Sequence, residues 1–388
     1  MDNHTSGGQR LVIKVGTRLL AHSTGQLNPD YIESLVKQVV RLHKLGNEVI
    51  IVSSGAIGAG IGRLQMDRRP SSIPEKQAAA AVGQGMLIQI YEKLFSEHGL
   101  TVAQVLLTRA DLISRRRYIN ARNTIDCLLK WEVVPIINEN DTVSVEEIKF
   151  GDNDRLSALV AGLIDARLLI ILTNIDGFYN DNPRKNPQAR LIPVVNDITP
   201  QMKSWAGLPA DDLATGGMVT KLQAAEIATN SGVGVYIADG TAPDILNRIT
   251  SGERVGTYFR PRKRYLSQRK RWIAYGQLVK GSVTVDNGAK RALCRQGKSL
   301  LPVGVISVDG SFKTGDLISV LDLEGKELGR GLTNFSSTEL SRIKKHASGD
   351  IPAILGGKDE PEEVIHRDNL VMYGYGSERR GKDASRGY

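Results

Sequence analysis

Over residues 1–259, short apolar runs alternate with longer segments of helical periodicity. The runs are rich in Val, Ile and Leu at consecutive positions, as in strands that are buried on both faces of a sheet. They span 11–15, 49–53, 101–107, 133–137, 168–173 and 233–238. The periodic segments predict helices over 31–45, 74–98, 118–131, 154–165 and 218–230. This alternation predicts an α/β domain with an open, mostly parallel sheet sandwiched by helices.

From residue 260 onward, both the charge and the pattern change. Residues 1–259 carry 27 basic and 27 acidic side chains, whereas 260–388 carry 24 and 15, so the net charge of +9 lies in the last third. Its steepest part is 260–271, with seven basic residues in twelve. The short alternating segments that follow, separated by glycine-rich turns, predict a small β-rich barrel or sandwich. We therefore expect a first domain over 1–259, a basic linker over 260–271, a second domain over 272–372 and a flexible tail over 373–388.

The cysteines and the apolar runs exclude several classes of protein. The chain has only two cysteines, Cys127 and Cys294, and no CxxC pair, which excludes a disulfide scaffold and a cysteine-rich zinc site. Residues 1–10 are polar, and no apolar run approaches the ~20 residues that a transmembrane helix needs. We expect a cytoplasmic protein that does not bind a membrane.

Polar residues and glycines follow five of the predicted strands. Ligands of open parallel sheets bind at the carboxyl ends of the strands, so these segments are candidate site residues. They are 14–17, 53–60, 138–141, 173–177 and 239–241. Loops are commonly polar, and each segment alone predicts little. Their coincidence at one edge of a sheet indicates a site.

Three segments lead directly into a predicted helix. The small residues at 54–58, and Gly216 and Gly217 within 215–221, leave backbone N–H groups open to a phosphate or a carboxylate. Lys221 then follows about one turn into its helix. Residues 151–154 supply more Asp and Asn than helix capping needs. With Asn138 and Asp141 they would form a polar cluster able to hold an ammonium group or a metal.

The same segments carry a resemblance to a known family. Residues 10–259 resemble the amino-acid kinase family and, within it, the glutamate 5-kinases. Residues 272–350 resemble a PUA domain, a small β-barrel that binds RNA in other proteins. The matching segments of the first domain include IKVGTRLL (13–20), IVSSGAIGAG (51–60), KQAAAAVGQ (76–84), INENDTV (137–143), KFGDNDRLSALVA (149–161) and TGGMVTKLQAA (215–225).

The resemblance implies an enzyme that transfers the γ-phosphoryl group of ATP to the γ-carboxylate of L-glutamate. The product would be L-glutamyl 5-phosphate, in the first step of proline biosynthesis, formed by in-line transfer without a covalent enzyme intermediate. Mg²⁺ would accompany ATP and be held largely by phosphates and water, and no metal-ligating residue is identified. Proline would act as a feedback inhibitor, and the chain would form a homo-oligomer, either a dimer or a tetramer.

The resemblance also implies roles for individual residues. Lys14 and Lys221 would hold phosphate oxygens, and Asp154 would orient the two lysines. The implied glutamate-binding residues are Ser54, Asp141 and Asn153, with Asp141 beside the substrate ammonium. The implied ATP-binding residues are Lys14, Gly16, Thr17, Gly55, Thr173, Asn174, Thr215, Gly216, Gly217, Met218 and Lys221. At Asn174 we expect aspartate from the family, and asparagine keeps the shape of that residue but loses its charge.

Two alternatives stay open. Another kinase of the same fold would use aspartate, acetylglutamate or a nucleotide monophosphate. A protein of a different class would bind RNA through its basic last third, because clustered Lys and Arg favour contacts with a phosphate backbone. Only Tyr265 and Trp272 accompany the basic run, which gives little support for base stacking. RNA binding is therefore not expected as the main role.

Overall fold

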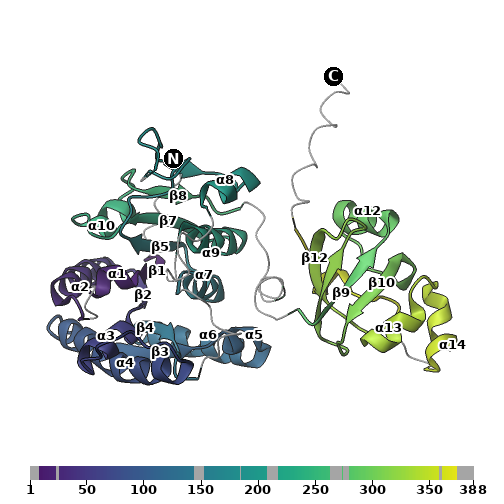
Figure 1. Ribbon diagram of the computed structural model, residues 1–388, viewed down its shortest axis with the longest axis horizontal. Coiled ribbons are helices and arrows are strands. Elements are labelled where there is room, and N and C mark those ends of the chain that lie inside the picture. The colour runs from purple at the N-terminus through teal and green to yellow at the C-terminus, as the bar shows by residue number, and fades with distance from the viewer. Residues whose placement is uncertain are drawn as a thin grey trace. The chain divides into compact units, whose positions relative to one another are not determined.

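The computed structural model describes residues 8–22, 26–143, 153–183, 185–207, 217–262, 273, 279–357 and 361–373. The chain divides into two compact units, Met1–Leu266 and Ser267–Tyr388. This division falls inside the basic segment 260–271, most of which lies outside the described residues, as does the predicted tail from 374 onward. Figure 1 draws both units.

An eight-stranded sheet forms the first unit (Figure 1), with its strands in the order β3-β4-β2-β1-β5-β7-β8-β6. The first six in this order run parallel, and β8 and β6 run antiparallel to them. The predicted α/β class and mostly parallel sheet are confirmed. The parallel strands are β1 (Arg10–Val15), β2 (Glu48–Val52), β3 (Val102–Leu107), β4 (Val134–Glu139), β5 (Leu168–Thr173) and β7 (Gly234–Asp239).

The two antiparallel strands were not predicted from the sequence. They are β6 (Val194–Val195) and β8 (Thr257–Phe259). Runs of two and three residues are too short to show a strand period. Together they extend the sheet beyond β7 at the edge remote from β3.

Helices cover both faces of this sheet (Figure 1). The helices α2 (Pro29–Lys44), α4 (Ile73–Ser96) and α10 (Ile245–Thr250) share a hydrophobic core with one face. The opposite face carries α6 (Arg115–Lys130), α7 (Asn153–Leu163) and α9 (Met218–Asn230). The shorter helices are α1 (Thr17–Leu20), α3 (Ala56–Arg63), α5 (Arg109–Ile113) and α8 (Pro200–Trp205).

Capping residues determine where the long helices begin. Asn28 accepts a hydrogen bond from the backbone of Tyr31, and proline occupies the first position of α2. Ser72 and Glu75 form a capping box at the start of α4. These caps place the first residue of each helix one or two positions before the predicted one.

The second unit contains a five-stranded sheet in the order β10-β9-β11-β12-β13 (Figure 1). Its core packs the sheet against α12 (Asn287–Gln296), α13 (Ser337–Ile343) and α14 (Ile351–Leu355). The predicted β-rich character is confirmed. The strands are β9 (Gly281–Val285), β10 (Val305–Gly310), β11 (Leu317–Leu321), β12 (Glu327–Leu332) and β13 (Leu370–Met372).

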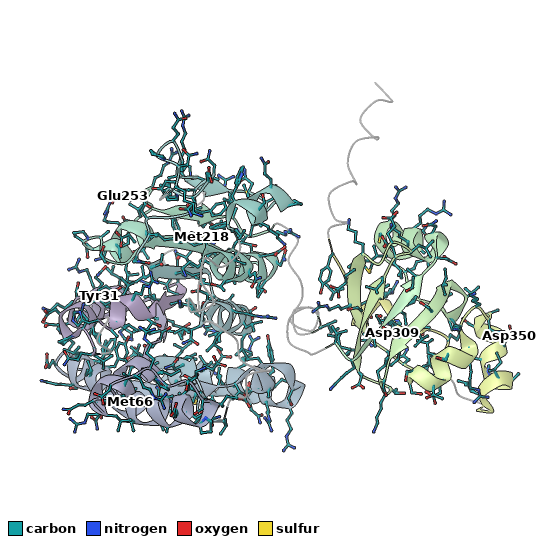
Figure 2. All side chains as sticks on the ribbon, viewed as in Figure 1. Tyr31, Met66, Met218, Glu253, Asp309 and Asp350 are labelled. Atoms are coloured by element: carbon teal, nitrogen blue, oxygen red, sulfur yellow. The ribbon has the colours of Figure 1, made fainter. Side chains whose placement is uncertain are left out.

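Side chains fill the space between sheet and helices within each unit (Figure 2). In the first unit the buried side chains are mostly Val, Ile, Leu and Ala, and the few buried charged residues include Lys14, Asp154 and Lys221. In the part of the chain that the structure describes, no helix has both the length and the apolar character to cross a membrane.

Candidate active site

The pleat of β1 points Lys14 toward α7. Side chains alternate between the faces of a strand. Leu11, Ile13 and Val15 belong to the core shared with α2 and α4, so Lys14 faces the other layer. α7 packs against β1 in that layer. Lys14 is only 2% exposed there, and a lysine so deeply buried requires a charged partner.

Asp154, in the first turn of α7, lies between two lysines. Its Oδ1 is 2.5 Å from the Nζ of Lys14, and its Oδ2 is 3.0 Å from the Nζ of Lys221, in the first turn of α9. All three side chains are buried, and together they carry one net positive charge. Because charges interact strongly where water is excluded, this arrangement favours an anionic group beside the ammonium groups. The structure thus brings together the three residues predicted as catalytic.

Two hydroxyl residues hold Asp154 in place. The Oγ1 of Thr220 lies 3.0 Å from Asp154 Oδ2 and 2.9 Å from the backbone oxygen of Gly217. The Oγ of Ser157 donates to the backbone oxygen of Asp154 over 2.6 Å. Neither hydroxyl was predicted from the sequence, because a Ser or Thr in the first turns of a helix is common and indicates no particular partner.

A cluster of amide and hydroxyl side chains joins β2, β4 and α7. The Nδ2 of Asn153 lies 2.7 Å from the backbone oxygen of Ser53, 2.8 Å from Asn138 Oδ1 and 3.2 Å from Ser54 Oγ. Two predicted glutamate-binding residues, Ser54 and Asn153, are therefore in contact. The third, Asp141, lies just beyond β4 and is partly buried.

One atom of this cluster is unpartnered. In the described part of the chain, the buried Oδ1 of Asn153 has no hydrogen-bond partner. A buried polar atom in this state requires an explanation, because native proteins satisfy nearly all such atoms. An amide oxygen can only accept, so a donor such as an ammonium group would satisfy it.

The residues predicted to bind ATP lie at strand ends or at the start of α9. Gly16 follows β1, and its N–H donates to the backbone oxygen of Leu172 in β5 over 3.1 Å. Gly55 precedes α3 with φ of 91°, a left-handed conformation that favours glycine. The other described members are the exposed Thr17 after β1, the buried Thr173 at the end of β5, the exposed Asn174 beside it, and Gly217 and Met218 at the start of α9.

Thr215 and Gly216, the other two predicted ATP-binding residues, lie outside the described residues. At Asn174, where the family resemblance predicts an aspartate, the hydroxyl of Thr173 lies 3.5 Å from the Oδ1 of the asparagine. The asparagine oxygen thus accepts from its neighbour as a carboxylate would, without the charge.

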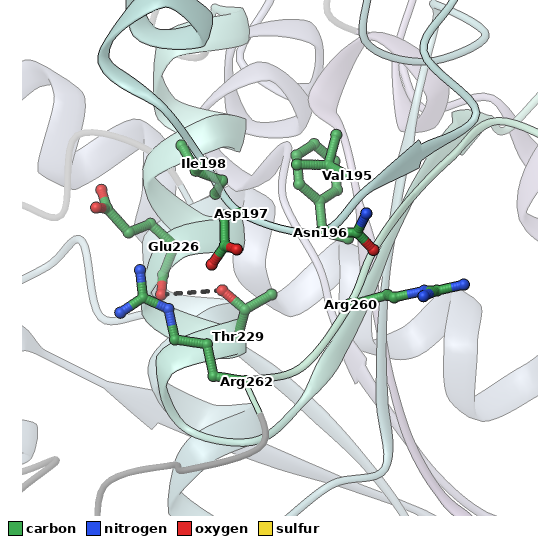
Figure 3. A pocket seen from close by; sticks show the side chains of 9 residues that line it. Val195, Asn196, Asp197, Ile198, Glu226, Thr229, Arg260 and Arg262 are labelled. Atoms are coloured by element: carbon green, nitrogen blue, oxygen red, sulfur yellow. Dashed lines mark hydrogen bonds between the residues drawn. The ribbon is translucent and has the colours of Figure 1, made fainter. Parts of the chain in front are cut away.

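A separate hollow lies at the opposite end of the strands (Figure 3). Val195 of β6 lines it, and Phe259 and Arg260 at the end of β8 also line it, beside the last turns of α9. Because β8 runs antiparallel to β7, Phe259 pairs with Val235 near the amino end of β7. None of the predicted site residues lines this hollow. It is therefore distinct from the cluster around Asp154.

Across the described ranges, no three His, Cys, Asp or Glu side chains gather as they would around a metal ion. The buried carboxylate of Asp154 is instead engaged by two ammonium groups. A metal carried by a bound phosphate would bring most of its own oxygen ligands.

Fold and site together define a phosphotransferase of the α/β class, with two lysines around one carboxylate at the carboxyl ends of parallel strands. The sequence profile of the amino acid kinase family matches residues 9–239, and that of the PUA domain matches residues 281–355. The chain belongs to the amino acid kinase family and is a kinase.

Curated relatives match both units together. The chain is 52% identical over 369 residues to a protein of Moorella thermoacetica named glutamate 5-kinase, covering 95% of this chain and 97% of that one. It is 51% identical over 372 residues to the glutamate 5-kinase of Caldanaerobacter subterraneus subsp. tengcongensis, covering 96% and 100%. The glutamate 5-kinase of Geobacter sulfurreducens is 52% identical over 364 residues, covering 94% and 97%.

Proposed function

We propose that this kinase phosphorylates the γ-carboxylate of L-glutamate with ATP, producing L-glutamyl 5-phosphate for proline biosynthesis. The observation that carries the proposal is the buried contact of Asp154 with Lys14 and Lys221. The names of relatives that are about half identical over nearly the full chain support glutamate as the acceptor. In the proposed reaction, an oxygen of the γ-carboxylate forms a bond to the γ-phosphorus while the bond to the bridging oxygen of ADP breaks.

The two lysines would stabilise charge during this transfer. In phosphoryl transfer, catalysis is mostly positioning together with electrostatic stabilisation of the transferring group. The ammonium groups of Lys14 and Lys221 share the carboxylate of Asp154, which holds both in one geometry. A general base is not required, because a glutamate side chain with a pKa near 4.3 is already ionised at neutral pH. Asp154 would therefore orient the lysines and would not accept a proton.

The amino-acid end of the substrate would bind at the cluster of Ser54, Asn138 and Asn153. The unpartnered Oδ1 of Asn153 is suited to accept from the substrate ammonium. Asp141, partly buried beyond β4, would add a negative charge beside that ammonium. Both features favour a substrate with a free amino group over an N-acetylated one.

Mg²⁺ is proposed to enter with ATP. Phosphate oxygens and water would hold the ion, and it would neutralise phosphate charge. We also propose that proline, which shares the α-carboxylate and the amine of glutamate, competes at or beside the same subsite, and that the chain forms a homo-oligomer. RNA is not proposed as the main partner.

The decisive experiment measures ADP release from Mg-ATP with L-glutamate, L-aspartate or N-acetylglutamate, with hydroxylamine present to trap an acyl phosphate. We expect turnover with glutamate alone, accompanied by γ-glutamyl hydroxamate. Turnover with another acceptor, or ADP release without hydroxamate, would contradict the proposal. Titrating proline against glutamate in the same assay tests the proposed inhibition, which should raise the KM for glutamate.

A further inference from the structure

We propose that Gln84 of α4 is a positioning residue for the amino-acid subsite, acting through Asn138 on Asn153. The inference rests on the proposed function, because glutamate is the ligand whose binding it concerns. Gln84 lies in the middle of α4 and not at a strand end, where site residues of parallel sheets are expected. Its side chain is only 9% exposed.

Backbone groups determine how the amides of this cluster are oriented. The backbone N–H of Glu139 can only donate, and it lies 2.9 Å from one amide atom of Asn138, which must therefore be the oxygen. The nitrogen of Asn138 then faces Gln84 and donates to its Oε1 over 2.8 Å. The hydrogen bond between these two amides thus has one direction, in which Asn138 donates and Gln84 Oε1 accepts.

A backbone group also determines the orientation of Asn153. The backbone oxygen of Ser53 can only accept, so the atom of Asn153 that lies 2.7 Å from it is Nδ2. That Nδ2 also lies 2.8 Å from Asn138 Oδ1. The Oδ1 of Asn153 is consequently turned away from its amide neighbour, and it is the unpartnered acceptor of the subsite. An unbroken series of hydrogen bonds links Gln84 to that acceptor.

The amide nitrogen of Gln84 argues against a purely structural role. Within the described ranges, the buried Nε2 of Gln84 has no hydrogen-bond partner. Burying an unpaired donor costs free energy of folding. An apolar side chain of similar length at this helical position would remove that donor, but it would leave the Nδ2 of Asn138 without its acceptor. The glutamine is therefore better explained by its hydrogen bond with Asn138, which positions that side chain, than by a contribution to stability.

A helix contact makes this hold rigid. A Cβ atom added to Gly83 would lie 1.8 Å from the backbone oxygen of Ala56 and 2.5 Å from the backbone nitrogen of Gly60. The backbones of α4 and α3 therefore touch directly beside Gln84. Ser54, at one end of the hydrogen-bonded cluster, lies two residues before α3, and Gln84, at the other end, lies on α4. The contact between α3 and α4 therefore holds both ends of the cluster. The close contact at Gly83 thus restricts the position of the Gln84 backbone relative to α3.

The test compares two buried glutamines. Gln84→Met removes the acceptor of Asn138 and keeps the length of the side chain. Gln38→Met is the matched control, since Gln38 is 8% exposed on α2 and its Oε1 accepts from the backbone of Leu246, outside the site. We expect Gln84→Met to raise the glutamate KM about tenfold, as the loss of one net hydrogen bond would, and to leave the ATP KM within about twofold. Gln38→Met should leave both KM values unchanged.

Rescue by a conservative variant separates positioning from folding. Gln84→Glu retains an oxygen that can accept from Asn138, and we expect its glutamate KM to lie well below that of Gln84→Met. If Gln84→Met does not fold, Gln84→Glu is compared with the unsubstituted chain, and a glutamate KM within about threefold supports the inference. The inference would be overturned by an unchanged glutamate KM in Gln84→Met, or by equal rises in the KM values for glutamate and ATP. In either case, glutamate turnover by the unsubstituted chain would still uphold the proposed function. Absence of that turnover would overturn both.

Discussion

The Oδ1 of Asp154 lies 2.5 Å from the Nζ of Lys14, and both side chains are almost completely buried. The contact joins the first turn of α7 to β1, elements that are far apart in the sequence. A buried ion pair contributes little net stability, because both charges lose their hydration. Removing one partner is nevertheless strongly destabilising, because the other charge remains buried. The pair therefore couples the geometry of the proposed catalytic site to the stability of the fold.

Substituting Asp154 should accordingly reduce both stability and activity. Asp154→Asn removes the charge that two buried ammonium groups share, and we expect the free energy of unfolding to fall by about 3–5 kcal/mol. Asp244→Asn is the control, because Asp244 pairs with Arg41 at the surface, where both side chains are largely exposed. The control should lose no more than about 1 kcal/mol. Urea denaturation measures both, and equal losses would contradict a special role for the buried contact.

Lys221 should matter for turnover and not for acceptor choice. Removing one charge that stabilises a transition state typically lowers kcat by about 100- to 1000-fold, and we expect a loss of this order for Lys221→Met. Lys203→Met is the matched control, since Lys203 pairs with Glu226 at an exposed position of α8. The control should retain nearly full kcat in the ADP-release assay. A Lys221→Met enzyme with undiminished kcat would remove this lysine from the proposed mechanism.

The approach of α3 to α4 gives a prediction from backbone geometry. Gly83→Ala places a Cβ 1.8 Å from the backbone oxygen of Ala56, so the helices must separate. We expect a lower melting temperature and a raised glutamate KM, because α3 leads back to Ser54. Gly85→Ala, two residues along the same helix, meets no atom within 4 Å. It should stabilise the protein by about 0.5–1 kcal/mol, since alanine favours the helix.

Thermal unfolding and glutamate titration of these two glycine variants check the prediction together. Similar melting temperatures for Gly83→Ala and Gly85→Ala would show that the helices separate without cost, contrary to the close contact.

Much of this architecture could be predicted from sequence because the signals are local. The strand over 168–173 and the helix over 218–230 coincide with β5 and α9. The rule that ligands bind at the carboxyl ends of parallel strands located the segments around Lys14, Ser54 and Asn138. The short antiparallel strands β6 and β8 were missed because they are too short to show a periodicity.

Other features of the site depend on packing and have no local signal. The role of Asp154 between two lysines came from the family resemblance, since an aspartate at a helix start is usually only a cap. Gln84 ends the matching segment 76–84, but the sequence does not indicate its partner, because Asn138 lies on a strand that only the folded sheet brings beside α4. Likewise, Thr220 gains its role from the approach of α9 to α7.

Acid should weaken the start of α4. The hydrogen bond from Arg68, followed by those from the backbone N–H groups of Ser71 and Ser72, lowers the pKa of Glu75 to about 2. In the unfolded chain the pKa returns to 4.5. The stabilisation from ionised Glu75 is therefore complete above pH 4.5 and is lost as the pH falls through about 2.

Melting temperatures of the unsubstituted chain and Glu75→Gln should differ most above pH 4.5 and converge as the pH approaches 2. Arg68→Gln removes the strongest donor to Glu75, so adding Glu75→Gln in that background should produce a smaller difference in melting temperature above pH 4.5. Because Glu75 is at the surface, added salt should reduce the contribution of Arg68. If the difference in melting temperature between the unsubstituted chain and Glu75→Gln does not vary with pH, the charge of the carboxylate contributes nothing to the stability of the start of α4.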